Sequence, residues 1–374
     1  MSAKTEQLLI SDVKNSQHRH HHSEENDKIS KDEAAVYDRQ IRLWGIEAQN
    51  KLRKSSVLVC GISQCGSEFV KNITLAGVQR LVLMDDKSIT EDDIGHNFLL
   101  RLDEKNLLGT NRARAAFSRT GELNPNVKLS YLENSLEEHL NSLDEEAGER
   151  FLSEFSLVAI FDHEYDTIVK LNNLCRKLNI RFVAGGVFGW IGYAFHDFND
   201  KMFLMRVETE FPTINLEGNS STQQNVVTIE EEQFHPKKLS YPSFFDAFNF
   251  TPSTKAQKRR ASRIPGAFYL LKAIFRAQKE KQFNGNEEHD LAVLEKNWNE
   301  ELVAFNQSKE TQSVQPDKFD HLFNPQFTPA CAMVGGIMGQ EVIKSLSEGK
   351  KPLPNVFIYC GIDSSCIMSA LPPK

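Results

Sequence analysis

Residues 37–66 hold the side chains of this chain that are best suited to chemistry on a phosphate. Their sequence is YDRQIRLWGIEAQNKLRKSSVLVCGISQCG. Arg39 offers a permanent charge and planar donors that can bind two phosphate oxygens at once. Gly61, Ser63 and Gly66 occupy the spacing of the G-x-G-x-x-G turn, which holds a pyrophosphate between a strand and a helix. The stretch therefore predicts a nucleotide-type βαβ unit.

One part of that turn is missing. Gly61 and Gly66 hold the first and third glycine positions, which serve the tight turn and the close packing of helix on strand. Ser63 holds the second position, where its Cβ would stand between the backbone amides and the phosphate. The pattern keeps the signal for the fold and weakens the signal for the ligand, so a strand-helix turn that binds nothing remains an alternative.

An acidic residue follows at the distance expected of a ribose-binding group. The run from Leu81 to Met84 predicts a second strand, which ends at Asp85. In dinucleotide and ATP sites an acid at this strand end accepts the ribose hydroxyls, about 20 residues after the glycine turn. We therefore expect Asp85 to lie beside Gly61 and Gly66.

The helix that carries Arg39 is predicted just before the first strand. Apolar residues recur there at helical spacing on one face: Ala34, Tyr37, Ile41 and Trp44. This pattern leaves Arg39 and Arg42 on other faces, able to reach away from the core. Spacing alone also allows a solvated helix face.

Strands and helices alternate after this helix. Apolar runs predict strands near residues 57–60, 81–84, 127–132, 155–162 and 180–198, and helices are expected near 111–123, 136–152 and 166–178. Such alternation is typical of an α/β fold with a doubly wound, mostly parallel, Rossmann-like sheet and helices on both faces.

The predicted organisation has four parts. Residues 1–33 form a polar tail that is expected to be disordered, and residues 34–200 form the first part of the α/β domain. Residues 201–322 form a helical insertion, with helices near 256–283 and 291–305. Residues 323–374 return to the sheet of the first part.

Composition argues against several classes of function. The 374 residues are 40% hydrophobic with a net charge of -7, so the chain can build a sizeable core and has no broad basic surface for nucleic acid. The longest apolar run, Val187 to Phe195, is too short to span a membrane. Six scattered cysteines form no C-x-x-C pair, so neither a disulfide framework nor a resident metal is expected.

Several motifs together resemble the ubiquitin-activating, ThiF/MoeB-like superfamily. They are YDRQIRLWG with AQ downstream, KNITLAGV after the glycine turn, the loop ending in NFLL, VFGWIGY, and the closing ACAMVGGIMGQEVIKSL. Within the superfamily, the chain resembles the smaller, non-thioester subunits of heterodimeric SUMO-activating enzymes. The resemblance covers residues 34–200 and 325–374.

The resemblance implies an enzyme that uses ATP and Mg²⁺ to adenylate SUMO and then captures it as a thioester, for passage to a conjugating enzyme. In this family two related adenylation folds face each other, and only one holds ATP productively. An active fold has an Asn and an Arg before its Phe-Leu, where this chain has Gly95 and His96. Together with Ser63, these departures imply that the glycine turn and Asp85 are kept as parts of the fold and bind no ATP.

The resemblance also implies a contribution across the subunit interface. Arg39 matches an arginine that reaches from one subunit's N-terminal helix into the ATP site of the other and contacts the phosphates. Adenylation builds negative charge near the α-phosphate, which a guanidinium stabilises. Asp162 matches, to within a residue, a magnesium-binding Asp of active subunits, which leaves residual nucleotide binding open.

No thioester cysteine is evident in the chain. Cys175 and Cys331 fall in predicted helices, where we expect them in the core. The family places the reactive cysteine on a partner subunit, so ATP and Mg²⁺ are expected mainly there. The insertion then corresponds to a reduced counterpart of the partner's cysteine domain.

Alternatives remain at this stage. They are the equivalent subunit for another ubiquitin-like modifier, a self-sufficient homodimeric ThiF/MoeB-like adenylating enzyme, and a Rossmann-type oxidoreductase, which Ser63 disfavours. The run from Lys258 to Arg263, KRRASR, is typical of a nuclear-import signal, with a charged first helical turn as the alternative. We therefore expect a nuclear location and leave the cytoplasm open.

Overall fold

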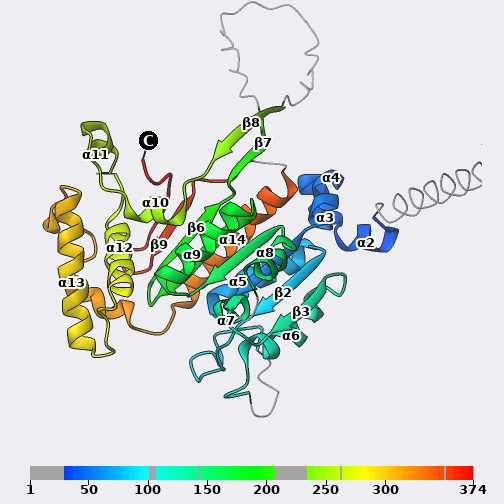
Figure 1. The fold of residues 1–374 in the computed structure, drawn as a ribbon, viewed down its shortest axis with the longest axis horizontal. Coiled ribbons are helices and arrows are strands. Elements are labelled where there is room, and N and C mark those ends of the chain that lie inside the picture. The colour runs from blue at the N-terminus through cyan, green and yellow to red at the C-terminus, as the bar shows by residue number, and fades with distance from the viewer. Residues whose placement is uncertain are drawn as a thin grey trace, which may run out of the picture.

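A computed structural model describes residues 29–100, 107–141, 144–206, 234–261, 263–348 and 351–373. Most of the predicted polar tail, residues 1–28, lies outside the described residues. The described chain is built on one large sheet with helices on both faces (Figure 1).

The sheet has eight strands in the order β10-β9-β6-β5-β4-β1-β2-β3. Their bounds are β1 Ser56–Cys60, β2 Arg80–Met84, β3 Lys128–Leu132, β4 Leu157–Phe161, β5 Arg181–Phe188, β6 Ile191–Asp197, β9 Val356–Cys360 and β10 Ser365–Ser369. The five strands from β3 to β5 pair in parallel, whereas β6, β9 and β10 pair antiparallel. This order confirms the predicted doubly wound, mostly parallel fold.

Both faces of the sheet are buried, and β1 shows how the sequence achieves it. All five of its residues are buried, as is typical of a central parallel strand. Leu58 and Cys60 join the core under α8 (Glu145–Ser153) and α9 (Tyr165–Lys177), whereas Val57 and Val59 join the core under α5 (Gln64–Ala76) and α14 (Thr328–Ser347). Side chains alternate along a strand, so a continuous apolar run serves two cores at once.

The helices of the sheet follow the predicted alternation closely. They are α5 Gln64–Ala76, α6 Arg112–Leu123, α7 Leu136–Asn141, α8 Glu145–Ser153, α9 Tyr165–Lys177 and α14 Thr328–Ser347. Side chains of Ser63, Asn111 and Asp144 cap the amino ends of α5, α6 and α8. These caps satisfy backbone amides that a helix leaves unpaired, which explains where each helix begins.

The N-terminal region differs from the single helix expected from its apolar spacing. It forms three short helices, α2 Lys31–Val36, α3 Asp38–Trp44 and α4 Ile46–Leu52. Gly45 breaks the second from the third with a φ of +87°, which favours glycine. Tyr37 is buried, and its hydroxyl accepts a hydrogen bond from Asn124 Nδ2 at 2.8 Å. The core contact of Tyr37 therefore fixes the first break.

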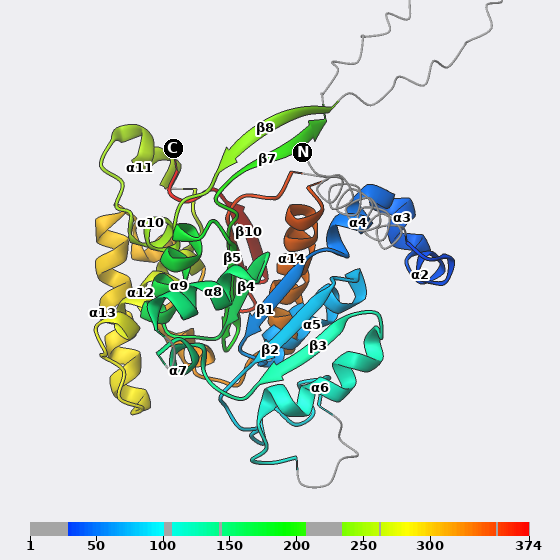
Figure 2. The same ribbon diagram turned by 45° about the vertical axis from the view of Figure 1, so that its right-hand side comes forward.

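Residues 200–322 contain more β structure than expected. Strands β7 Asp200–Arg206 and β8 Phe234–Ser240 pair antiparallel and project from the main body (Figure 2). The sequence did not reveal the pair, because the apolar run of β7 spans only residues 202–205 and 27 residues separate β7 from β8. The segments that follow are α10 Phe244–Asn249, α11 Lys255–Ala261, α12 Gly266–Lys279, α13 Glu287–Ala304 and the 3₁₀ helices η1 Lys309–Thr311 and η2 Pro316–Leu322.

The helices of this part pack on the sheet. The predicted helix over 256–283 is divided by Pro265, because a proline disfavours helical geometry in the residue before it. Aromatic rings make the contact with the sheet, and the centroids of Tyr193 on β6 and Phe275 on α12 lie 5.2 Å apart. The domain boundaries drawn from the sequence stay predictions. In the described part of the chain, no helix combines the length and apolar character needed to cross a membrane.

Candidate functional site

The carboxyl ends of β1, β2 and β4 meet at one edge of the sheet. The strand order reverses between β1 and β4, and a doubly wound sheet places its ligand crevice at such a point. A cavity of about 640 Å³ lies there. Its lining includes Ser63, Arg112, Asp162 and His96, together with Gln326 of the segment before α14. The geometry thus brings together the glycine turn, the acidic strand end and the loop before Phe98.

Gly61 and Gly66 are required by packing. Gly61 has a φ of +88°, and a Cβ on it would lie 2.3 Å from the carbonyl oxygen of Phe161. A Cβ on Gly66 would lie 2.1 Å from the carbonyl oxygen of Gly61. Both distances are far shorter than atoms tolerate. The two glycines are therefore needed for the strand-helix turn whether or not a ligand binds.

Ser63 occupies the position that a phosphate would use. Its Oγ accepts a hydrogen bond from the Gly66 amide at 3.2 Å and so caps α5. The same Oγ donates to Asp162 Oδ2 at 2.5 Å. The amino end of a helix attracts phosphate through its free amides and its dipole. Here the Ser63 hydroxyl takes the Gly66 amide of that helix end and donates its own hydrogen to Asp162.

Asp85 lies beside the turn as expected, but its carboxylate is fully engaged. It is 3% exposed and accepts hydrogen bonds from the amides of Ile62 at 2.6 Å and Lys87 at 2.9 Å. Arg112 Nε donates to Asp85 Oδ2 at 3.0 Å, and a second guanidinium nitrogen donates to Oδ1 at 3.3 Å. No oxygen of this acid is left for ribose hydroxyls.

Arg112 is the residue of this site that the sequence did not identify. Asn111 caps α6 and orients Arg112 toward the edge of the sheet. Burial lowers the pKa of Arg112, but attraction from Asp85 and Asp93 outweighs it, so the pKa is raised overall. The local sequence around either residue does not predict this bidentate pair, because the pair forms only when α6 packs beside β2.

Asp162 is also held inside the chain. Its backbone φ is +54°, and its Oδ1 accepts a hydrogen bond from the Val187 amide at 2.8 Å. Its other oxygen accepts from Ser63, as described above. Beside it, burial and the nearby Lys87 lower the pKa of His163, which favours the neutral ring. The carboxylate that would face a metal thus accepts hydrogen bonds from Ser63 and Val187 instead.

The loop before Phe98 borders the cavity through His96 and carries no Asn-Arg pair at residues 95 and 96. Gly95 has a φ of +86° with open space around it. His96 is exposed, and its Nδ1 lies 2.8 Å from the carbonyl oxygen of Asp92. Asn97, in contrast, is buried and donates to the carbonyl oxygen of Ile62 at 3.0 Å, which ties the loop to the turn.

These residues do not fit Mg²⁺-ATP. A nucleotide needs a free ribose acceptor and open amides at the helix end, and a metal needs a free carboxylate. Asp85, Ser63 and Asp162 each meet a partner inside the chain instead. No cluster of three or more His, Cys, Asp or Glu side chains that could hold a metal occurs in the ranges that the structure describes.

Arg39 lies apart from this cavity, on α3. The side chain is exposed, and it forms no ion pair or hydrogen bond with the described residues. Arg42 on the same helix binds Asp38 at 3.0 Å, with both side chains largely in solvent. No residue of α3 is buried, so the helix is presented outward at the edge of the molecule (Figure 1).

The cysteines do not form a nucleophilic site. Cys175 and Cys331 are fully buried, and burial raises the pKa of both thiols well above its usual range. A thiol with a raised pKa is a poor nucleophile, because the thiolate is the reactive form. Cys366 is exposed on β10 and has no described charge partner that would activate it.

Comparison with known proteins gives a consistent result. The model of the ThiF family matches residues 37–372. The SUMO-activating enzyme subunit aos-1 of Caenorhabditis elegans is 44% identical over 347 residues, which cover 92% of this chain and 99% of that protein. The human SUMO-activating enzyme subunit 1 is 32% identical over 351 residues, covering 92% of this chain and 97% of the human protein.

A solved structure supports the fold. The crystal structure of E. coli MccB superposes with a TM-score of 0.52 at 11% sequence identity. The match covers 91% of this chain and 70% of that chain. At this level of identity the likeness concerns the arrangement of strands and helices alone.

Proposed function

The chain belongs to the ThiF family, and on that basis we propose that it is the smaller subunit of a heterodimeric SUMO-activating enzyme. It pairs with a subunit that bears the thioester cysteine and supports the ATP-dependent adenylation and thioester capture of SUMO. The relatives that carry this name match nearly their whole length, so no large part of them lacks a counterpart here.

One contrast carries the proposal. The polar groups of this chain's own nucleotide-type cavity are paired with one another, whereas Arg39 is exposed and unpaired within the described residues. We infer that Arg39 acts in trans on ATP phosphates in the partner's site. A guanidinium can bind two phosphate oxygens and keeps its charge at every physiological pH.

An apolar surface supports the partner assignment. Large apolar side chains are exposed on the three short helices that include Arg39: Val36 on α2, Leu43 on α3 and Ile46 on α4. Contacts of α3 with both α2 and α4 keep these helices side by side. A monomeric protein seldom exposes such a group of side chains without a partner. The same surface therefore presents both the docking contacts and Arg39.

ATP and Mg²⁺ are assigned mainly to the partner. ThiF-type adenylation is ATP-dependent, and the cavity of this chain does not fit the nucleotide or its metal.

The insertion supplies no cysteine, since Cys175 and Cys331 lie outside it. Its helices instead stabilise one face of the sheet, and a conjugating enzyme would be met through the assembled complex.

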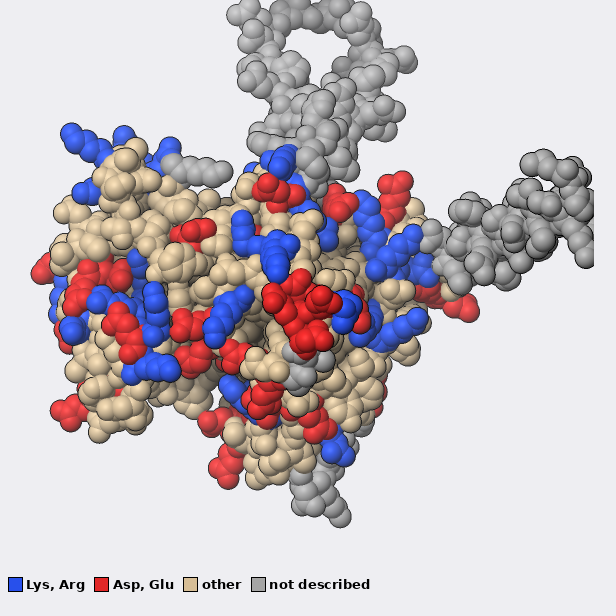
Figure 3. All heavy atoms as spheres, viewed as in Figure 1, with Lys and Arg blue, Asp and Glu red and all other residues tan. Residues whose placement is uncertain are grey.

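A nuclear location is part of the proposal. Lys and Arg side chains gather over α11, at the upper left of Figure 3. Lys255, Lys258 and Arg260 are exposed there, and Arg263 follows the helix. An exposed basic cluster suits recognition by acidic grooves of import receptors. Replacing these four residues by serine should shift a fluorescent fusion toward the cytoplasm, and an unchanged distribution would contradict this role.

Modifier-dependent exchange of pyrophosphate into ATP tests the proposed function. The chain is assayed alone and then with a cysteine-bearing partner, with SUMO, ubiquitin or the cullin modifier as substrate. We expect no exchange by the chain alone and exchange with the partner in the presence of SUMO. Exchange by the isolated chain, or exchange that prefers another modifier, would contradict the proposal.

A further inference from the structure

Helix α3 carries Arg39 but buries none of its own residues. Tyr37 precedes the helix and Gly45 follows it. Gly45 has a φ of +87° and open space around it, so packing at this joint does not fix the direction of the chain. The orientation of α3, and with it the reach of Arg39, therefore depends on contacts made at the two ends of the helix.

Tyr37 fixes the beginning of α3. Its side chain is buried against Gly77, where an added Cβ would lie 2.5 Å from Tyr37 Cζ. Its hydroxyl accepts a hydrogen bond from Asn124 Nδ2 at 2.8 Å. The same nitrogen donates to the carbonyl oxygen of Thr74 at 2.8 Å. Because Thr74 and Gly77 lie in and just after the last turn of α5, the beginning of α3 is attached to the end of α5.

Gln49 on α4 holds the other end of α3. It is 0% exposed, and its Oε1 accepts a hydrogen bond from Trp44 Nε1 at 3.0 Å. Its Nε2 donates to the carbonyl oxygen of Ala76 at 2.9 Å. Trp44 is the last residue of α3, and Ala76 is the last residue of α5, where a helix leaves its carbonyl groups unpaired. The buried amide thus links the end of α3 to the end of α5 across the Gly45 joint.

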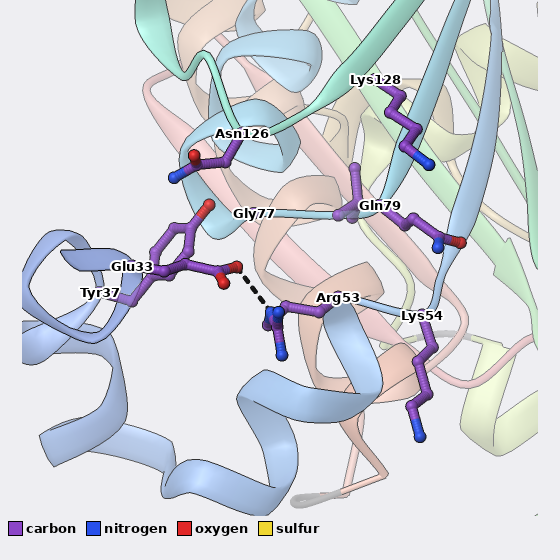
Figure 4. A pocket seen from close by; sticks show the side chains of 9 residues that line it. Glu33, Tyr37, Arg53, Lys54, Gly77, Gln79, Asn126 and Lys128 are labelled. Atoms are coloured by element: carbon purple, nitrogen blue, oxygen red, sulfur yellow. Dashed lines mark hydrogen bonds and ion pairs between the residues drawn. The ribbon is translucent and has the colours of Figure 1, made fainter. Parts of the chain in front are cut away.

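The two helices that flank α3 are also tied to each other. Glu33 on α2 pairs with Arg53, which follows α4, and Arg53 Nε lies 2.6 Å from Glu33 Oε1 (Figure 4). The two side chains are only 21% and 18% exposed, so salt screens this ion pair less than an exposed one. Helix α3 is therefore held from its two ends and its neighbours rather than by a buried face of its own.

We propose that Gln49 is a positioning residue, which orients α3 so that Arg39 reaches the ATP phosphates in the partner's site. The inference rests on the proposed role of Arg39 in trans. Two fixed points define the direction of a helix, and Tyr37 supplies one while Gln49, through Trp44, supplies the other. Displacing a reacting group by about 1 Å can cost about 10²-fold in rate. A residue that touches no substrate can therefore control the reaction.

Two variants of the heterodimer remove this link in different ways. Gln49→Met keeps the length of the side chain but loses both hydrogen bonds, and it should slow adenylate formation about 10²-fold at saturating ATP and SUMO. Trp44→Phe loses only the indole donor and should slow it about tenfold, because Gln49 stays bound to Ala76. Pyrophosphate exchange measures both rates, and gel filtration checks that the heterodimer is assembled.

Combination with Arg39→Ala separates positioning from stability. If Gln49 acts through Arg39, adding Gln49→Met to Arg39→Ala should cost less than about twofold further. A loss of stability alone would instead slow both backgrounds by the same factor. As a matched control, Asn172→Leu removes another buried amide with two hydrogen bonds, to Asp197 and Phe244, and should change the rate less than about twofold in either background.

Two results would overturn the inference and leave the proposed function standing. Gln49→Met slows the reaction equally with and without Arg39, or it leaves the rate unchanged while Arg39→Ala slows it. An unchanged rate in Arg39→Ala would refute the role of Arg39 itself, and the positioning role with it. If Gln49→Met does not assemble, Trp44→Phe decides the question in the same two backgrounds, because it leaves Gln49 bound to Ala76.

Discussion

The nucleotide-type cavity and helix α3 use charged residues in opposite ways. In the cavity, Asp85 binds Arg112 and Asp162 binds Ser63, so each functional group meets a partner within the chain. On α3, Arg39 meets none among the described residues. The family's fold thus surrounds a cavity whose polar groups are paired with one another, while α3 presents an exposed cation outward.

The difference has an energetic reason. A buried charge that has no ligand must be paired with another group of the protein. Leaving one partner of a buried ion pair unpaired costs about 3 to 5 kcal/mol. The Asp85 and Arg112 side chains are 1% and 11% exposed, so their pairing neutralises both charges inside the crevice. An exposed arginine has no such requirement, because water solvates it until a partner arrives.

The largest expected effect is on α3. Arg39→Ala should slow adenylate formation by the heterodimer about 10³-fold, the low end for an arginine supplied in trans. Pyrophosphate exchange measures the rate, and gel filtration should show an intact heterodimer. Arg42→Ala is the matched control. It should slow adenylate formation less than about threefold, because the exposed ion pair of Arg42 with Asp38 is weak. An equal effect of both substitutions would remove the distinction drawn for Arg39.

The next effect concerns the glycine turn. Gly66→Ala should lower the free energy of unfolding by about 3 kcal/mol or more, because its Cβ overlaps the Gly61 carbonyl oxygen. Urea denaturation of the isolated chain measures the change. Gly336→Ala on α14 is the control, since open space surrounds that position, and it should stabilise by about 0.5 to 1 kcal/mol. An unchanged free energy of unfolding in Gly66→Ala would mean that packing does not hold the turn.

A histidine away from both regions should contribute a pH dependence of stability. Burial lowers the pKa of His196 on β6 from its usual 6.5 to about 4. Folding therefore favours the neutral ring, so this contribution is complete above about pH 6.5 and is lost as the pH falls toward 4. At pH 5 the loss should be about 2 kcal/mol. Denaturation of His196→Gln at pH 7 and pH 5 checks this, and an unchanged pH dependence in the variant would assign the effect elsewhere.

The smallest effect is expected from restoring the second glycine. Ser63→Gly should lower stability by about 1 to 2 kcal/mol, since glycine is itself a tolerable cap but Asp162 loses the hydroxyl that donates to it. It should not restore ATP binding, because Asp85 remains held by Arg112. Titration with a fluorescent ATP analogue measures binding. Recovery of affinity in this single variant would show that Ser63 alone closes the cavity.

The sequence predicted the order of elements well, and the structure places Gly61, Gly66 and Asp85 at the same edge of the sheet. Spacing of Gly61, Gly66 and Asp85 depends on one βαβ unit, and local patterns are sufficient to place such a unit. The sequence did not predict the contacts between residues that lie far apart along the chain. The pairing of Ser63 with Asp162 joins residues 99 positions apart, and Arg112 reaches Asp85 only after α6 has packed.

Two errors in the predicted elements have similar causes. The N-terminal helix was expected to be continuous, but Tyr37 turns into the core and Gly45 takes a positive φ. The pairing of β7 with β8 was missed because the apolar run of β7 is only four residues long and 27 residues separate the two strands. In both places, tertiary contacts decide a geometry that local propensity leaves undetermined.

The most direct test is the stoichiometry of ATP binding in the presence of Mg²⁺. Equilibrium dialysis with labelled ATP compares the isolated chain, the cysteine-bearing partner and the heterodimer at one nucleotide concentration that saturates the heterodimer. A single ATP for each heterodimer and none for the isolated chain is the predicted result. Two ATP molecules for each heterodimer, or binding by the isolated chain, would contradict the conclusion that this chain's own cavity is closed to the nucleotide.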